Sequence, residues 1–178
     1  MNKFLPMLVL ILLCGCPRTS SNETSSNNFV ANASFSGKDE SGRPLQFAGY
    51  SPSGALQVKA HNGIITVSKV ADGTLSLMYP TQVVPIRPNK RYRISVEIST
   101  EKLISYVFPE AQIVDAQGKS LGFEGTSQRA SGTSPWKTYS FEISTPEKAS
   151  SLIVTFGRSY DFETGTFFLR NPQVTSIS

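Results

Sequence analysis

The sequence predicts an all-β protein, an antiparallel β-sandwich formed by residues 29–178. Apolar and polar residues alternate with a period of two through eight or more short segments, as in strands with one buried face and one wet face. Turn-forming residues separate these segments, and no long stretch keeps apolar residues at helical spacing. Many short strands in one body of about 150 residues indicate two packed sheets.

The clearest strands are predicted at residues 91–99, 137–144 and 152–156, where every second residue is apolar. Weaker alternation marks five further segments, at residues 56–60, 65–67, 75–79, 111–113 and 167–169. We expect the inward residues of the three clearest strands to form the core: Tyr92, Ile94, Val96, Ile98, Phe141, Ile143, Leu152, Val154 and Phe156.

Glycine-containing turns mark the predicted corners of the sheets. Asn62-Gly63 is the strongest hairpin signal, because both residues tolerate the positive φ of a tight two-residue turn. Residues 71–73 predict a second hairpin, between the strands that flank them. Further corners are expected at Gly118, at residues 131–133 and at residues 164–165.

The composition excludes several classes of protein. Lys and Arg number 17 against 13 Asp and Glu, and a net charge of +4 is far below the dense basic patch typical of nucleic-acid binders. Two Cys and one His, with both Cys near the N-terminus, exclude a zinc cluster and a disulfide scaffold. We therefore expect no nucleic-acid partner, no metal and no cofactor.

Residues 1–15 have the composition of a secretory signal peptide. Lys3 precedes an apolar run at residues 4–14, which is too short to cross a membrane as a helix. The following Leu13-Cys14-Gly15-Cys16 resembles the bacterial lipobox, which implies cleavage before Cys16 and a diacylglycerol and acyl chains such as palmitate on that cysteine. A plain signal peptide with incidental cysteines is the alternative.

Residues 16–28 would then be the lipid-anchored cysteine and a flexible tether. The segment after Cys16 is rich in Ser, Thr and Asn and has no apolar residue with which to form a core. Two or more acyl chains anchor a protein stably. The expected location is the bacterial cell envelope, with the domain held at the periplasmic or surface face of a membrane.

The order of signals along the body resembles carbohydrate-binding modules of families four and nine, within the galactose-binding-like jelly rolls. The matching fragments are Asn32 with Phe35, residues 42–44, 54–58 and 82–84, Pro88 through Tyr92 to Ser95, residues 136–141, and residues 165–169. The resemblance implies a jelly-roll β-sandwich that binds an oligo- or polysaccharide without catalysis. Members often carry acidic residues near a structural calcium in the last strand, where this chain has Arg170-Asn171, so we expect no calcium site.

A sugar site needs flat aromatic rings for the apolar faces of pyranoses and planar polar groups for their hydroxyls. We expect the loops to supply the rings and one solvent-exposed strand face to contribute polar groups. The aromatic candidates are Tyr50, Tyr79, Tyr106, Phe108, Tyr160 and Phe162. The polar candidates are Arg93, Glu97, Gln112 and Arg158. Trp136 is expected mainly to pack at the edge of the sandwich.

No catalytic constellation is apparent, so we expect a protein that is not an enzyme. His61, the only His, directly precedes a turn, and Glu97 and Glu142 are better explained as solvated strand charges than as the carboxylate pair of a glycosidase. Two functions remain open. One is a tethered module that binds carbohydrate, and the other is a structural lipoprotein that contacts a cell-envelope protein and has no affinity for sugar.

Overall fold

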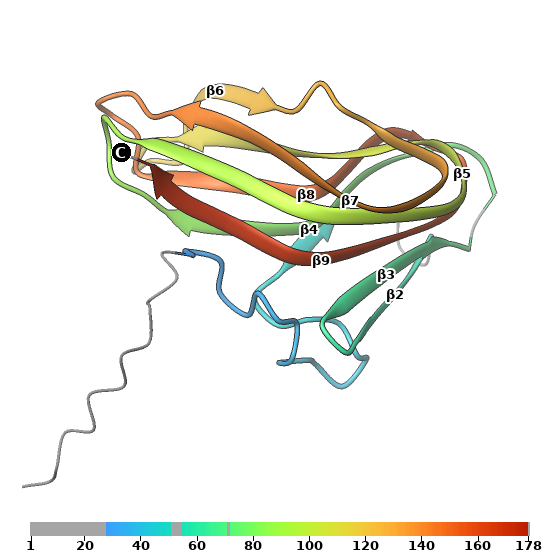
Figure 1. The fold of residues 1–178 in the computed structure, drawn as a ribbon. Helices are drawn as coiled ribbons and strands as arrows, with labels where there is room; N and C mark the ends of the chain where they lie inside the picture. Colours follow the sequence, from blue (N-terminus) through green and yellow to red (C-terminus); the bar gives the residue numbers. More distant parts are fainter. Residues whose placement is uncertain (1–27, 51–54, 71, 178) are drawn as a thin grey trace, which may run out of the picture.

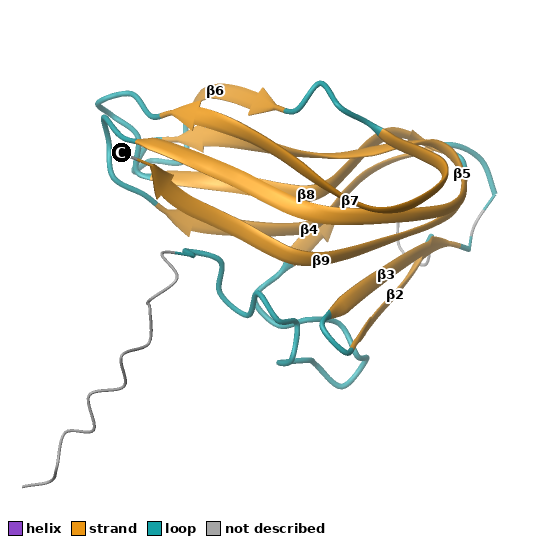
Figure 2. Cartoon of the chain, viewed as in Figure 1, coloured by secondary structure: helices purple, strands orange, loops and turns teal. Residues whose placement is uncertain are grey.

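The computed structural model describes residues 28–50, 55–70 and 72–177, and all of their regular structure is β-strand (Figures 1 and 2). Within these residues nine strands form one curled antiparallel sheet. They are β1 Ala48–Tyr50, β2 Leu56–His61, β3 Ile64–Lys69, β4 Leu75–Pro85, β5 Arg91–Val114, β6 Ser120–Gly125, β7 Ala130–Ser144, β8 Ser151–Phe162 and β9 Thr164–Ile177. The predicted all-β class is confirmed.

The sheet folds into two layers because β5 belongs to both. The first half of β5 lies between β7 and β9, and β3 and β2 continue this first layer beyond β9. Its second half lies between β6 and β8, and β4 and β1 complete the second layer. Between the halves, Lys102 and Ser105 have φ angles of 49° and 121°, and the pairing register shifts there. Such irregularities bend a strand and increase its twist.

The space between the layers is filled by the predicted core. Eight of the nine residues expected there are buried, and the ninth, Phe141, is partly buried and packs against the others. Phe141 is less covered because β7 is at the edge of its layer. The inward residues of the five weaker segments also belong to this core or pack against it. Strand alternation therefore assigned the buried face correctly.

The turns follow the prediction in part. Asn62 and Gly63 join β2 and β3 with φ angles of 48° and 75°, as expected for a two-residue hairpin. The second hairpin is wrong, since β3 pairs with β2 and β9 whereas β4 pairs with β1 and β8. The chain crosses from one layer to the other there, and Ala71 lies outside the described residues. Gly132 is within β7 and does not form a corner.

The segment from Asn28 to β1 is tied to both layers. Asn28 donates to the Pro172 carbonyl at 3.1 Å and accepts from the Val174 amide at 3.0 Å, which fixes the start of the domain along β9. Gln82 of β4 accepts from the Ala31 amide at 2.9 Å and donates to the Gln46 carbonyl at 3.1 Å. These bonds satisfy a buried amide side chain, as burial requires.

No helix in the described part of the chain is long and apolar enough to cross a membrane. The expected signal peptide, the anchor Cys16 and the tether as far as residue 27 lie outside the described residues.

Candidate functional site

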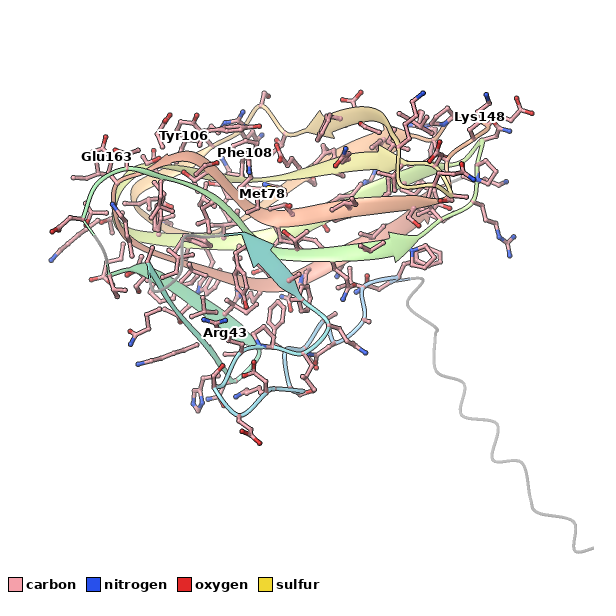
Figure 3. The ribbon with its side chains drawn as sticks, turned by 180° about the vertical axis from the view of Figure 1, so that it is seen from behind. Arg43, Met78, Tyr106, Phe108, Lys148 and Glu163 are labelled. Carbon is pink, nitrogen blue, oxygen red and sulfur yellow. The ribbon has the colours of Figure 1, made fainter. Side chains whose placement is uncertain are left out.

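Three aromatic rings form a row on the outer face of the second layer, the face turned away from the core. Tyr106 and Phe108 come from β5 and Tyr160 comes from β8. The ring centroids of Tyr106 and Phe108 are 5.9 Å apart, and those of Phe108 and Tyr160 are 6.0 Å apart, both in tilted arrangements. Figure 3 shows Tyr106 and Phe108 close together on this side of the molecule. Phe108 is buried by its neighbours on this face and is not part of the main core cluster.

A carboxylate and a guanidinium fix the position of Tyr160. Its hydroxyl donates to Oε2 of Glu110 at 3.2 Å, and the guanidinium carbon of Arg158 lies 4.2 Å from its ring centroid. Nε of Arg158 is 3.4 Å from Oε1 of Glu110, and these two side chains are only 14% and 15% exposed. The pair is thus an ion pair largely withdrawn from water, with Tyr160 stacked above it.

Arg129 covers the other end of the row. Its guanidinium carbon lies 3.4 Å from the Phe108 ring centroid and 5.5 Å from that of Tyr106. The guanidinium also donates to the Thr126 carbonyl, so the segment between β6 and β7 holds Arg129 over the rings. A cation and three rings are therefore arranged before any ligand arrives.

These residues border a shallow groove of about 330 Å³ on the same face. It is lined by Phe108, Glu110, Phe123, Glu124, Gly125, Thr126, Ser127, Arg129 and Tyr160. Two of its rings reach solvent, since Phe123 of β6 is 62% exposed and Tyr160 is 47% exposed. The groove thus offers two exposed aromatic rings together with carboxylate, guanidinium and hydroxyl groups.

Five predicted residues meet on this face: Tyr106, Phe108, Gln112, Arg158 and Tyr160. Phe108 pairs with Arg158 across β5 and β8, and Met78 of β4 continues the same row, as Figure 3 shows. Gln112 is further along β5, where it pairs with Phe123 of β6. The prediction placed the aromatic candidates in loops, and this is wrong, because every one of them belongs to a strand.

Two predicted aromatic residues do not reach this surface. Phe162 is fully buried and packs edge-on against Phe167 in the core, with centroids 5.8 Å apart. Tyr79 is buried among the core residues, and burial raises the pKa of its phenol to about 12. Neither ring is available to a ligand in this structure. The side chain of Tyr50, at the end of β1, lies outside what the structure describes.

Arg93 and Glu97 lie on the outer face of the first layer and not beside the aromatic row. The expectation of one shared surface is therefore wrong, because the first half of β5 belongs to one layer and the second half to the other. Arg93 contacts Glu142 at 2.7 Å. Glu97 accepts hydrogen bonds from Asn171 at 2.6 Å and Arg170 at 2.8 Å, and these donors lower the pKa of its carboxyl.

Seven groove residues were not predicted: Glu110, Phe123, Glu124, Gly125, Thr126, Ser127 and Arg129. Alternation along residues 108–112 does place Glu110 on the same face as Phe108 and Gln112. Phe123 and Glu124 belong to the short strand β6, whose two glycines weaken the strand pattern. Arg129 is in an irregular segment, and no sequence period relates it to Phe108.

Among the described residues, no three His, Cys, Asp or Glu side chains cluster as metal ligands would. Near the last strand, where the family resemblance would place a calcium ion, Arg170 instead pairs with Glu97 at 2.7 Å. The absence of a metal and of a cofactor stays a prediction.

Solved structures share this fold at low sequence identity. The enzymatically active domain of tailspike protein 4 from bacteriophage CBA120 aligns over 85% of this chain with a TM-score of 0.65 and 13% identity, although this chain spans only 22% of it. A CBM4 structure aligns over 83% of this chain and 99% of its own, with a TM-score of 0.52 and 15% identity.

The CBM22-1 xylan-binding domain of Xyn10C from Paenibacillus barcinonensis aligns over 82% of this chain and 92% of its own, with a TM-score of 0.53 and 13% identity. No curated protein matches the sequence. The family model CBM_4_9_1, described as BppA domain 1, matches residues 56–174. The match covers every strand from β2 to β8 and most of β9, and it agrees with the resemblance found in the sequence. The chain therefore belongs to the CBM_4_9 family of carbohydrate-binding modules.

Proposed function

We propose that the domain binds an oligo- or polysaccharide, without catalysis, in the groove on the outer face of the second layer. One observation carries the proposal: the exposed rings of Phe123 and Tyr160 line the same groove as Glu124 and Arg129. Rings of this kind stack on the apolar faces of sugars, and charged or planar polar groups bind their hydroxyls. The proposal is also supported by membership of a family of carbohydrate-binding modules.

The groove is suited to weak, reversible binding. It is open to solvent, so a bound sugar would bury little area, and each hydroxyl would exchange a bond to water for a bond to protein. The rings of Phe108 and Tyr160 need little reorganisation when a sugar binds, because Arg129 already packs on Phe108 and the Tyr160 hydroxyl already donates to the Glu110 carboxylate. Preorganisation of this kind lowers the cost of binding.

Replacing either Tyr160 or Phe123 with alanine is expected to weaken strongly the retention of the protein on the polysaccharide that it binds. Each change removes a ring that the groove presents to solvent. The measurement is affinity electrophoresis or pull-down of the full chain on xylan, cellulose, chitin and peptidoglycan. Phe29→Ala is the matched control, because this ring is 44% exposed but contacts Tyr92, at 5.9 Å between centroids, outside the groove.

Unchanged retention of both groove variants would contradict this location for the site. If the wild-type chain is retained by none of the four polysaccharides, the proposal of sugar binding fails. The structural or protein-interaction function would then take its place, to be tested by the loss of a co-purifying envelope protein in the same variants.

We further propose that the domain is held at a membrane of the bacterial cell envelope by lipid on Cys16. The support is the lipobox-like sequence Leu13-Cys14-Gly15-Cys16 and the polar residues 17–28 that follow it. A short polar segment between Cys16 and Asn28 would keep the domain within about 20 Å of the membrane surface.

Replacing Cys16 with serine is expected to prevent attachment of acyl chains, to release the protein from the membrane fraction and to leave the precursor uncleaved. The reason is that serine offers no thiol for the diacylglycerol. The measurement is metabolic labelling with radioactive palmitate, followed by electrophoresis. Cys14→Ser is the matched control and should keep the label. Label retained in the Cys16 variant would contradict the anchor.

A further inference from the structure

A second polar groove is present on the opposite side of the molecule, across the outer face of the first layer. Thr138 of β7 pairs with Glu97 of β5, and Glu97 pairs with Arg170 of β9, so the three side chains form one row across the layer. Asn171 and Gln173 continue along β9 beside this row. The groove has a volume of about 220 Å³ and is lined mainly by these polar residues.

The central carboxylate of this groove is fixed in place but keeps capacity for a ligand. Nε and Nη2 of Arg170 lie 2.8 Å and 2.7 Å from Oε2 of Glu97, and Nδ2 of Asn171 donates to Oε1 at 2.6 Å. A carboxylate accepts about four hydrogen bonds. Glu97 can therefore accept one more, and a hydroxyl group is the neutral donor that would fit without disturbing the ion pair.

An aromatic ring stands next to the row. Trp136, the only tryptophan of the chain, precedes Thr138 by two residues on the same face of β7. The guanidinium carbon of Arg170 lies 4.3 Å from its ring, and Phe168 packs on it with centroids 6.5 Å apart. The ring is thus held in one orientation while it remains partly exposed. Packing at the edge of the sandwich, the main role predicted for Trp136, accounts for these contacts but not for the groove beside the ring.

We propose that this face is a second carbohydrate-binding site, which takes a neutral sugar unit by stacking at Trp136 and hydrogen bonds to Glu97 and Gln173. The charges of Glu97 and Arg170 cancel, so the groove favours hydroxyl groups over a charged ligand. The inference rests on the proposed function of the domain and extends it, because two sites on opposite layers would let one domain hold two polysaccharide chains or two segments of one chain.

The test uses the fact that the chain has a single tryptophan. Indole fluorescence reports the second groove and not the first, whose aromatic residues are tyrosine and phenylalanine. The full chain, kept in a sugar-free detergent, is titrated with cellohexaose, xylohexaose and chitohexaose. We expect a saturable change in Trp136 fluorescence with at least one of these probes. Gln173→Ala should weaken that binding about fivefold, the size expected for one lost hydrogen bond.

Tyr160→Ala separates this inference from the proposed function. It should leave the Trp136 titration unchanged while it weakens retention on polysaccharide to the level that the second groove alone supports. No fluorescence change with any probe would overturn the second site, even where the wild-type chain is retained on polysaccharide. A titration of Gln173→Ala with the wild-type affinity, or a fluorescence change that disappears in Tyr160→Ala, would also overturn it. If the first groove alone fails to bind sugar, the Trp136 titration stays intact and Tyr160→Ala is retained on polysaccharide as well as the wild-type chain.

Discussion

Replacing Ile94 with alanine is expected to lower the free energy of unfolding by about 2–5 kcal/mol, as large-to-small changes in a core do. Ile94 is fully buried in the middle of β5, and its strand neighbours on either side are Phe141 of β7 and Val174 of β9. The cavity left by the smaller side chain would lie where three strands of the first layer meet, which limits how far the structure can close around it.

Phe141→Ala is the comparison for this change. Phe141 lies on the same side of the layer but on its edge strand, and it is only partly buried. We therefore expect a smaller loss than at Ile94, although the side chain removed is larger. Urea denaturation of both variants measures the difference. A loss below about 0.5 kcal/mol at Ile94, the range of surface substitutions, would show that this face of β5 is not in the core.

Alternation in the sequence was sufficient to assign the buried faces, because the apolar side of each strand must face the core and its polar side faces solvent. It could not assign strands to layers. Residues 91–99 and 111–113 predict two separate strands, and the residues between them do not keep the alternation that would show one strand, β5, continuing through a bend at Lys102 and Ser105. The layer assignment depends on contacts between distant segments.

The candidate site was only partly predicted, because the sequence does not show to which layer each residue belongs. Arg93 and Phe108 are both on β5, but the bend places them on different layers. In β8 the alternation that buries Phe156 is interrupted at Gly157, where a Cβ would collide with the Tyr79 carbonyl. Residues after Gly157 therefore change sides, and the sequence alone could not show that Tyr160 reaches the groove while Phe162 returns to the core.

Glu110→Ala is expected to have the largest effect on the candidate site, because it alters both stability and binding. We expect a loss of about 3 kcal/mol in the free energy of unfolding, the lower end of the range for breaking a buried ion pair. The change would leave the Arg158 guanidinium, only 14% exposed, without its carboxylate. It would also release the Tyr160 hydroxyl, so retention on polysaccharide should fall as well.

Glu142→Ala is the matched control, because its partners Arg91 and Arg93 are more than half exposed and surface ion pairs contribute at most about 1 kcal/mol. Replacing both Glu110 and Arg158 with leucine should recover much of the stability, since no charge is then left buried alone. Retention of the double variant on polysaccharide should stay reduced, because leucine cannot orient Tyr160. Equal losses from Glu110→Ala and Glu142→Ala in urea denaturation would show that the Glu110 pair is solvated like a surface pair. Arg129 and the contacts among the rings would then be what holds the aromatic residues of the groove in place.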